Sequence, residues 1–327
     1  MNFEISNIFS TSNLCADYIQ SPVSNGVLVV TFTERGNRDL AGLGFGSQFL
    51  IKYGFDVVAI KTNVDFWYEN LSNDLIDKII SRTGVLSRKY SAKIAYGSSM
   101  GGYAAIKFAR VLDVDCVLSI SPLYDIKDPF DARWKNDVLH LGEALMMGVE
   151  CISKKASYCF IFDPLTKDAY HIDKYKEIIP FENISTLSVK YSGHPSGPYL
   201  RDIGALPQVV LHAFENYRLP DNLIEFKKRK LDSSAYVFNL SLSCLSHGKI
   251  RWAESLCNVL LMRNPLNAEY HMLFCKILEK KKDFDKAIAA CSRAAVLNPA
   301  NQNFSMYRDI LVKKQLKLFG SSTSKPC

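Results

Sequence analysis

A serine between two glycines offers the clearest chemistry in this sequence of 327 residues. Gly97, Ser99 and Gly101 form the pattern Gly-x-Ser-x-Gly, with an apolar run (92–96) before it and a helical pattern (100–112) after it. Glycines at these two positions let neighbouring backbone approach closely, so that a strand can turn into a helix and present the serine at the bend. The spacing therefore predicts that Ser99 is a nucleophile for acyl groups. No phosphate-binding glycine pattern is present at this turn.

A serine hydroxyl needs a base to take its proton and a third group to hold that base. His194 follows the last predicted strand, in the stretch Tyr-Ser-Gly-His-Pro-Ser-Gly, and is the expected base. The acid is expected after the preceding strand (158–162), where Asp163 and Asp168 both stand. Asp168 is favoured because it comes directly before a helical pattern, but the sequence leaves the choice open. The other aspartate would cap a turn or a helix.

Negative charge that develops on a substrate oxygen needs two backbone amides to stabilise it. The amide of Met100, directly after the serine, is the first expected donor. The loop after the first predicted strand should supply the second, from Phe32 or Thr33.

Two further patches follow other strands and could shape a pocket. Trp67 and Tyr68 lie in one patch, and Arg133 and Trp134 lie in the other. The three aromatic side chains could stack on a sugar or aryl group, while Arg133 could bind an acidic group. An equally good interpretation is that the aromatic residues close the edge of the domain.

The elements that must position these residues form an alternating pattern. Apolar runs rich in Val, Ile and Phe alternate with amphipathic stretches, which is typical of a mostly parallel sheet with helices on both faces. The sequence predicts an α/β fold over residues 1–220, with strands at 27–33, 55–61, 92–96, 116–120, 158–162 and 186–191, and helices at 73–86, 100–112, 171–179 and 200–217.

With its serine, acid and histidine in that order, the region 1–220 resembles the α/β-hydrolase superfamily in a compact form with little or no cap domain. The resemblance implies that Ser99, His194 and one of the two aspartates act together as a catalytic triad. The His-Gly-Gly-Gly sequence of many lipases is absent, which argues against a typical lipase.

A basic linker is expected at 221–233, and a repeat follows it. Ala253 and Ala287 are 34 residues apart, as are Cys257 and Cys291, and Pro265 and Pro299. This period resembles that of tetratricopeptide repeats, although Leu260 replaces a small residue and the usual Trp and Tyr positions are missing. The resemblance implies a small all-α domain at 234–318, built from two repeats and a capping helix, with a flexible tail at 319–327. Two repeats and a last helix are fewer helices than such arrays usually need alone, so the domain is expected to pack against the catalytic domain or a second copy of the chain. It could also bind a protein partner.

Composition narrows the remaining possibilities. Hydrophobic residues make up 48% of the chain and charged residues 22%, which is ordinary for a globular protein. The residues from 221 onward hold 18 Lys and Arg against 9 Asp and Glu, whereas the first 220 hold 22 against 24. The basic part is either a solvated surface or a surface for an acidic partner. Neither a nucleic-acid motif nor metal-ligand spacing is present. Scattered cysteines, no transmembrane run and no secretory signal suggest a cytoplasmic location.

These observations favour an esterase or related acyl hydrolase that needs no cofactor. The alternative is an O-acetyltransferase that uses the same triad, an acyl donor such as acetyl-CoA and a carbohydrate or polysaccharide hydroxyl as acceptor. A hypothesis of a different class is a non-catalytic interaction protein that acts through its repeats.

Overall fold

The computed structural model describes residues 4–81, 90–139, 141 and 147–322, which belong to two compact units. Unit 1 is Met1–Lys228 and unit 2 is Arg229–Cys327. The boundary lies within the segment 221–233 that the sequence suggests as a linker. Much of this segment is a 3-10 helix, from Ile224 to Asp232.

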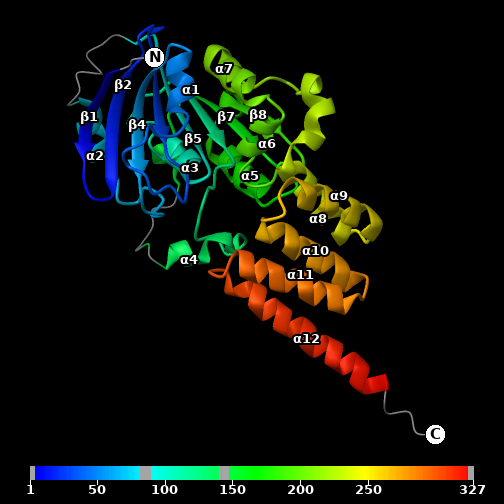
Figure 1. The fold of residues 1–327 in the computed structure, drawn as a ribbon. Helices are drawn as coiled ribbons and strands as arrows, with labels where there is room; N and C mark the ends of the chain where they lie inside the picture. Colours follow the sequence, from blue (N-terminus) through cyan, green and yellow to red (C-terminus); the bar gives the residue numbers. More distant parts are fainter. Residues whose placement is uncertain (1–3, 82–89, 140, 142–146, 323–327) are drawn as a thin grey trace. The chain divides into compact units, whose positions relative to one another are not determined.

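Unit 1 is built on an eight-stranded sheet with the order β1-β2-β4-β3-β5-β6-β7-β8 (Figure 1). β2 pairs antiparallel with both β1 and β4, and all other neighbours are parallel. The mostly parallel sheet predicted from the sequence is therefore confirmed. The strands are β1 (Glu4–Ser10), β2 (Leu14–Gln20), β3 (Val27–Phe32), β4 (Asp56–Thr62), β5 (Ala92–Ser98), β6 (Cys116–Ile120), β7 (Ser157–Phe162) and β8 (Ile184–Ser188).

Helices cover both faces of the sheet, because its central strands carry apolar side chains on each side. α2, α3 and α5 share one large core with the strands. On the other face, Phe214 of α7 packs edge-on against Tyr96 of β5, with ring centroids 5.8 Å apart. The helices of unit 1 are α1 (Ser47–Lys52), α2 (Asn73–Ser81), α3 (Met100–Lys107), α4 (Lys135–Val138), α5 (Asp168–Ile178), α6 (Gly197–Asp202) and α7 (Leu206–Asn216).

Several elements differ from those predicted. β1, β2 and α1 were not predicted at all. The helix expected at 200–217 is divided into α6 and α7, since Gly204 between them has a φ of +79° and ends the first helix. The last part of the helix expected at 73–86, residues 82–86, lies outside the described residues.

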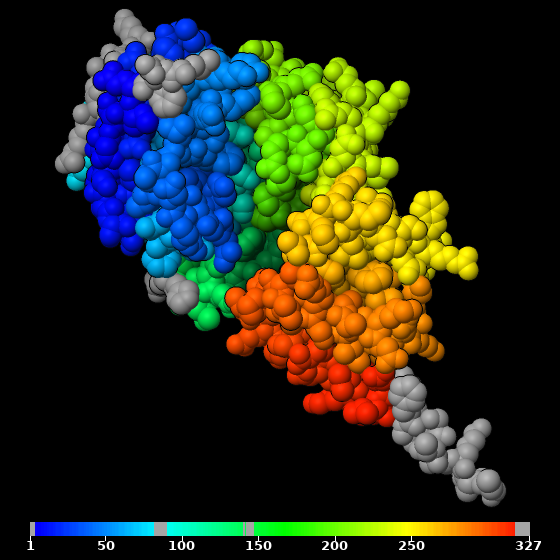
Figure 2. All heavy atoms as spheres, viewed as in Figure 1, coloured from blue at the N-terminus to red at the C-terminus, as the bar shows by residue number. Residues whose placement is uncertain are grey.

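The described part of unit 2 contains α-helices that follow one another from yellow to red in Figures 1 and 2. They are α8 (Ser234–Ser246), α9 (Ile250–Arg263), α10 (Ala268–Lys280), α11 (Phe284–Leu297) and α12 (Gln302–Ser322). α8 pairs with α9 and α10 with α11, and the second pair begins 34 residues after the first. α12 runs into the expected tail, whose last residues, 323–327, lie outside the described part.

The helix pairs of unit 2 pack through the residues that define its period. Ala253 and Cys257 of α9 are fully buried, and so are their counterparts Ala287 and Cys291 of α11. Leu260, the exception to the small-residue pattern, is also fully buried. The helical C-terminal region predicted from the sequence is therefore confirmed.

Candidate active site

The backbone bends sharply at Ser99, between the end of β5 and the start of α3. Ser99 has φ 52° and ψ −116°, a conformation that non-glycine residues adopt only where the surroundings enforce it. Its amide donates a hydrogen bond of 2.8 Å to the carbonyl of Ile120 at the end of β6. A Cβ on Gly97 would lie 2.2 Å from the carbonyl oxygen of Gly101, and one on Gly101 would lie 2.3 Å from that of Phe32. The two glycines thus permit the bend.

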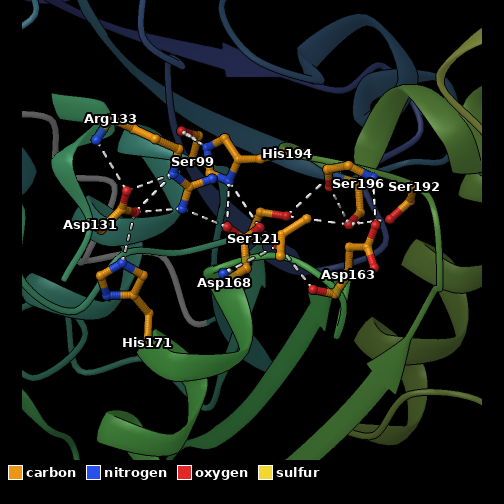
Figure 3. A network of polar contacts seen from close by, with 12 residues as sticks. Ser99, Ser121, Asp131, Arg133, Asp163, Asp168, His171, Ser192, His194 and Ser196 are labelled. Carbon is orange, nitrogen blue, oxygen red and sulfur yellow. Dashed lines mark hydrogen bonds and ion pairs between the residues drawn. The ribbon is translucent and has the colours of Figure 1, made fainter. Parts of the chain in front are cut away.

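Ser99, His194 and Asp168 form a hydrogen-bonded series (Figure 3). Ser99 Oγ lies 2.9 Å from His194 Nε2, and His194 Nδ1 lies 3.0 and 2.9 Å from the two carboxylate oxygens of Asp168. The Asp168 side chain is fully buried and that of His194 is 11% exposed. With Nδ1–H donating to Asp168, Nε2 is left to accept the serine proton. The geometry is suited to activating the hydroxyl of Ser99.

Asp163, the other acid candidate, binds backbone instead of the imidazole. Its carboxylate accepts hydrogen bonds of 2.8 Å from the amide of Gly193 and 2.9 Å from that of Leu165. Burial raises the pKa of Asp163 above its usual value, although these amides act in the opposite direction. Asp163 therefore fixes the loop that carries His194.

Buried serine hydroxyls fix the other side of the same loop. Ser121 Oγ accepts a hydrogen bond of 3.1 Å from the amide of Ser196, and Ser192 Oγ donates one of 2.8 Å to Ser196 Oγ. All three serines are almost completely buried. Together with Asp163 they hold the backbone on both sides of His194, so that its ring has a defined position.

Arg133, expected from the sequence to bind an acidic group of a substrate, lies against the acid of the series. Its Nη2 donates to Asp168 Oδ1 at 2.9 Å, and its guanidinium also binds both carboxylate oxygens of Asp131. Burial opposes the ionisation of Asp168, but the hydrogen bond and charge of His194 and the charge of Arg133 outweigh it. The pKa of Asp168 is therefore held below its usual value.

Asp131 and His171 complete this network, and the sequence analysis did not single them out as site residues. His171 Nε2 lies 3.2 Å from Asp131 Oδ2, and both side chains are fully buried. The only sequence signal was that His171 follows Asp168 by three residues on one helix, a spacing that places two side chains on the same face.

Trp67 and Tyr68 have almost no exposed surface with which to stack on a substrate, which corrects their expected role. Their side chains are 0% and 1% exposed, respectively, and belong to the core of unit 1. Trp67 Nε1 donates to Asp137, and the hydroxyl of Tyr68 lies 2.9 Å from that of Thr33. The alternative interpretation, that these aromatic residues close the domain, describes them correctly.

Trp134 differs from these two because it contacts the histidine. Its ring centroid lies 5.4 Å from that of His194 in an edge-on arrangement. Among the described residues, its buried Nε1 has no hydrogen-bond acceptor. Trp134 is therefore the one expected stacking residue that borders the reacting groups.

The amides expected to stabilise a substrate oxygen differ in availability. Met100 is the first residue of α3, where backbone amides lack an acceptor within the helix. The amide of Thr33 donates to the carbonyl of Ile60 at 3.3 Å, so it is already engaged in the sheet. Phe32 is the last residue of β3, paired with β4 on one side and β5 on the other. Met100 is thus the better placed of the three.

A polar cavity of about 420 Å³ lies between the loops that follow β3 and β4 and helix α4. The carbon at the centre of the Arg35 guanidinium is 5.6 Å from the centroid of the Trp134 ring, which in turn packs on His194. The cavity therefore adjoins the site through Trp134. Its polar lining consists of Arg35, Arg38, Asn63, Asp65, Asn136 and Asp137.

No protein-family profile matches the sequence, and no curated protein matches it significantly. Solved structures are similar to part of the chain. The capsule O-acetyltransferase of Neisseria meningitidis serogroup A is 13% identical with a TM-score of 0.42, covering 56% of this chain and 85% of that one. A thermophilic esterase of Thermogutta terrifontis is 12% identical with a TM-score of 0.48, covering 66% of this chain and 91% of that one. An esterase of Pyrococcus furiosus is 13% identical with a TM-score of 0.45, covering 65% of this chain and 90% of that one.

The order of the sheet, its direction and the serine turn after β5 describe the fold by themselves. Unit 1 has an α/β-hydrolase-type fold. Among the described residues, none of the helices has the length and apolar character of a membrane span. Within the same part of the chain, no group of three or more His, Cys, Asp and Glu side chains is arranged so that it could hold a metal ion.

Proposed function

We propose that this chain is a serine-dependent acyl-transfer enzyme, with an esterase or related acyl hydrolase as the leading form. The observation that supports it most is the hydrogen-bonded series of Ser99, His194 and Asp168 at a strained turn. Ser99 is the proposed nucleophile, His194 the base and Asp168 the group that orients the imidazole and stabilises its positive charge.

In the proposed reaction, Ser99 Oγ attacks the carbonyl carbon of an ester while its proton passes to His194 Nε2. The amide of Met100 and the dipole of α3 stabilise the negative charge on the carbonyl oxygen. The leaving alcohol takes the proton from His194, and the acyl group stays on Ser99. A water molecule, deprotonated by His194, then attacks the acyl carbon and releases the acid and the free serine.

A fluorophosphonate probe and hydrolysis of p-nitrophenyl acetate test this proposal. Ser99→Ala should abolish labelling, and both Ser99→Ala and His194→Ala should lower hydrolysis at least about a thousandfold. Ser98→Ala, one residue earlier in β5, is the matched control and should keep both activities. Undiminished labelling of Ser99→Ala would overturn the assignment of the nucleophile. A folded wild-type chain that neither reacts nor hydrolyses would favour the non-catalytic alternative.

The second candidate is an O-acetyltransferase, and the polar cavity beside Trp134 favours it. Beside Val64 and Phe66, the lining holds arginine, aspartate and asparagine side chains, which offer hydrogen bonds to a polyhydroxyl acceptor such as a carbohydrate. The acyl donor would be an activated ester or thioester, of which acetyl-CoA is one. The steps up to acyl-Ser99 are the same, and the acceptor hydroxyl then replaces water.

Partition of the acetyl group distinguishes the two candidates. With p-nitrophenyl acetate as donor and a panel of sugars as acceptors, mass spectrometry should find acetylated sugar in addition to acetate. Asn136→Ala, in the lining of the cavity, should lower that fraction without changing the rate of fluorophosphonate labelling. If no sugar ever diverts acetyl from water, the transferase form is excluded for the tested acceptors.

Unit 2 is proposed to be a tetratricopeptide-like module that binds a partner or a second copy of the chain. Its 34-residue period and the buried small residues at equivalent positions support this assignment. Its excess of lysine and arginine favours an acidic partner. Light scattering of the full chain at several concentrations tests self-association. If the mass equals that of one chain at every concentration, self-association is excluded and binding of a different protein remains.

A further inference from the structure

One short turn of the chain contacts both the acid and the base of the candidate triad. The 3-10 helix Ala132–Trp134 lies in the segment between β6 and β7, and Asp131 caps it by accepting a hydrogen bond from the amide of Arg133. Arg133 reaches Asp168, and the ring of Trp134 packs on His194. The residues 131–134 are called the clamp turn below.

The clamp turn joins Asp168 to a second buried carboxylate through one cation. Arg133 Nη2 lies 2.9 Å from Asp168 Oδ1 and 2.5 Å from Asp131 Oδ2, while its Nε lies 2.8 and 2.9 Å from the two oxygens of Asp131. Both aspartate side chains are 0% exposed, and that of Arg133 is 30% exposed. Interactions between charges this close and this buried are only weakly screened by solvent.

His171 is neutral in this network, because its hydrogen-bond partners fix its tautomer. The amide of Tyr124 donates to His171 Nδ1 at 3.2 Å, so this nitrogen carries no proton. The ring proton is then on Nε2, which lies 3.2 Å from Asp131 Oδ2 and donates to it. Burial keeps the pKa of His171 below its usual value despite the neighbouring carboxylate. His171 therefore positions Asp131 without adding charge.

The charges of the cluster then follow. Asp168 and Asp131 contribute two negative charges and Arg133 one positive charge, so the cluster carries −1 while His194 is neutral. When His194 takes the proton of Ser99, the cluster becomes neutral. Removing Arg133 would leave an excess of negative charge and favour protonated His194, whereas neutralising Asp131 would have the opposite effect.

We propose that Arg133 and Asp131 are positioning residues that set the proton affinity of His194 through Asp168, so that the clamp turn determines the pH range in which Ser99 is activated. This inference rests on the proposed function. The groups that face His194 are Ser99, Asp168 and the ring of Trp134. The charged groups one contact further away are Arg133, Arg35 beside the Trp134 ring, and Asp163, which accepts from the amide of Gly193; Asp131 follows beyond Arg133.

The rate of fluorophosphonate labelling as a function of pH provides the test, because it needs no natural substrate. The rate should rise with pH as His194 loses its proton, and the midpoint of that rise is the measured quantity. Arg133→Met should move the midpoint up by about one pH unit and Asp131→Asn should move it down by a similar amount. Arg133→Lys, which keeps the charge, should stay near the wild type.

The double variant Arg133→Met/Asp131→Asn separates the charge effect from a merely structural one. It removes a cation and an anion together, so its midpoint should return close to that of the wild type. If the two residues had only a structural role, the double variant should instead label more slowly than either single variant. Arg201→Met, which removes an exposed arginine of α6 paired with its neighbour Asp202, is the matched control and should not move the midpoint. Circular dichroism checks that each variant is folded.

The outcomes distinguish this inference from the proposed function. If Ser99→Ala still labels, the proposed function fails. If Ser99→Ala does not label but the midpoints of Arg133→Met and Asp131→Asn coincide with the wild type or move in the same direction, the function stands and the role of the clamp turn is overturned. Should Arg133→Met not fold, Asp131→Asn and the double variant decide alone.

Discussion

Two buried carboxylates near His194 have opposite electrostatic surroundings. Burial disfavours the ionised form of Asp168, but His194 and Arg133 stabilise the anion, so the pKa of Asp168 is lowered. Asp163 binds only backbone amides, and burial raises its pKa. The first carboxylate thus favours the folded state when it is ionised, and the second favours it when it is protonated.

This difference predicts how the free energy of unfolding depends on pH. The stabilisation from Asp168 is present above its unfolded pKa of about 3.9 and is lost as the pH falls through the lower folded value. Asp168→Asn should therefore make the acid side of the stability profile shallower, because this loss no longer occurs. Urea unfolding of both proteins at several pH values between 6 and 3 measures this slope.

Asp163→Asn is the comparison for that experiment. Its raised pKa means that ionisation near and above pH 4 weakens the folded state, so acidification strengthens it at this position. Removing that effect should make the free energy of unfolding fall more steeply with decreasing pH than it does in the wild type. Equal changes of slope in the two variants would show that these carboxylates do not differ as the structure indicates.

The candidate nucleophile and base could be predicted from the sequence more fully than the contacts that support them. Ser99 and His194 stand in local patterns, a glycine-flanked turn and a glycine-containing loop after a strand. The contacts of Asp131 and Arg133 depend on the path of the segment between β6 and β7, which no periodicity encodes. The full burial of Trp67 is likewise a tertiary result, since the residue type suits a pocket as well as a core.

At the scale of elements, a buried ion pair holds the N-terminal edge of the sheet. Lys61 of β4 is 1% exposed, and its Nζ donates to Asp17 of β2 at 2.6 Å and to the carbonyls of Leu40 and Gly42. One side chain therefore joins two strands and the loop that follows β3. This loop also supplies arginines to the polar cavity.

The same pair explains why β2 was not predicted. Asp17 in the middle of the strand interrupts the apolar pattern that identified β3 to β7. Lys61 neutralises its buried carboxylate, which also accepts a hydrogen bond of 2.8 Å from the side-chain amide of Asn7. The central strands could be predicted because their burial on both faces requires continuous Val, Ile and Phe. β1 and β2 have no such continuous apolar run, although β2 is buried and lies between β1 and β4.

Lys61→Met tests the importance of this pair. It should lower the free energy of unfolding by about 3 kcal/mol, because the carboxylate of Asp17 is left buried without its cation. Lys78→Met, at an exposed position of α2, is the control and should change it by less than about 0.5 kcal/mol. Urea titrations of both variants give the comparison, and equal stabilities would show that Asp17 is compensated by other groups.

At the scale of the molecule, each unit buries its own core and the candidate site belongs to one of them. Ser99, Asp168 and His194 all lie in unit 1, and the cores of unit 2 are formed by its own helices. The repeat period predicted a helical C-terminal region from the sequence. The exact boundary was not predictable, because the basic segment before it forms a 3-10 helix and is not an extended linker.

Residues 1–228, expressed alone, should therefore keep the chemistry of the site. We expect labelling by the fluorophosphonate within about twofold of the full chain, since no residue of the hydrogen-bonded series is removed. The same fragment carrying Ser99→Ala is the control for specific labelling. A folded fragment that no longer reacts would mean that the activity depends on unit 2.

The clamp turn has a consequence for how the site can diversify. Trp134 stands between His194 and the polar cavity, while Arg133, one residue earlier, bonds to Asp168. A change in this turn that reshapes the cavity for another acceptor would also disturb the hydrogen bonds of the acid. A change of acceptor specificity obtained in the clamp turn should therefore also change the pH at which the enzyme is active. Changes in the loops after β3 and β4, which line the cavity without contacting Asp168, should alter specificity alone.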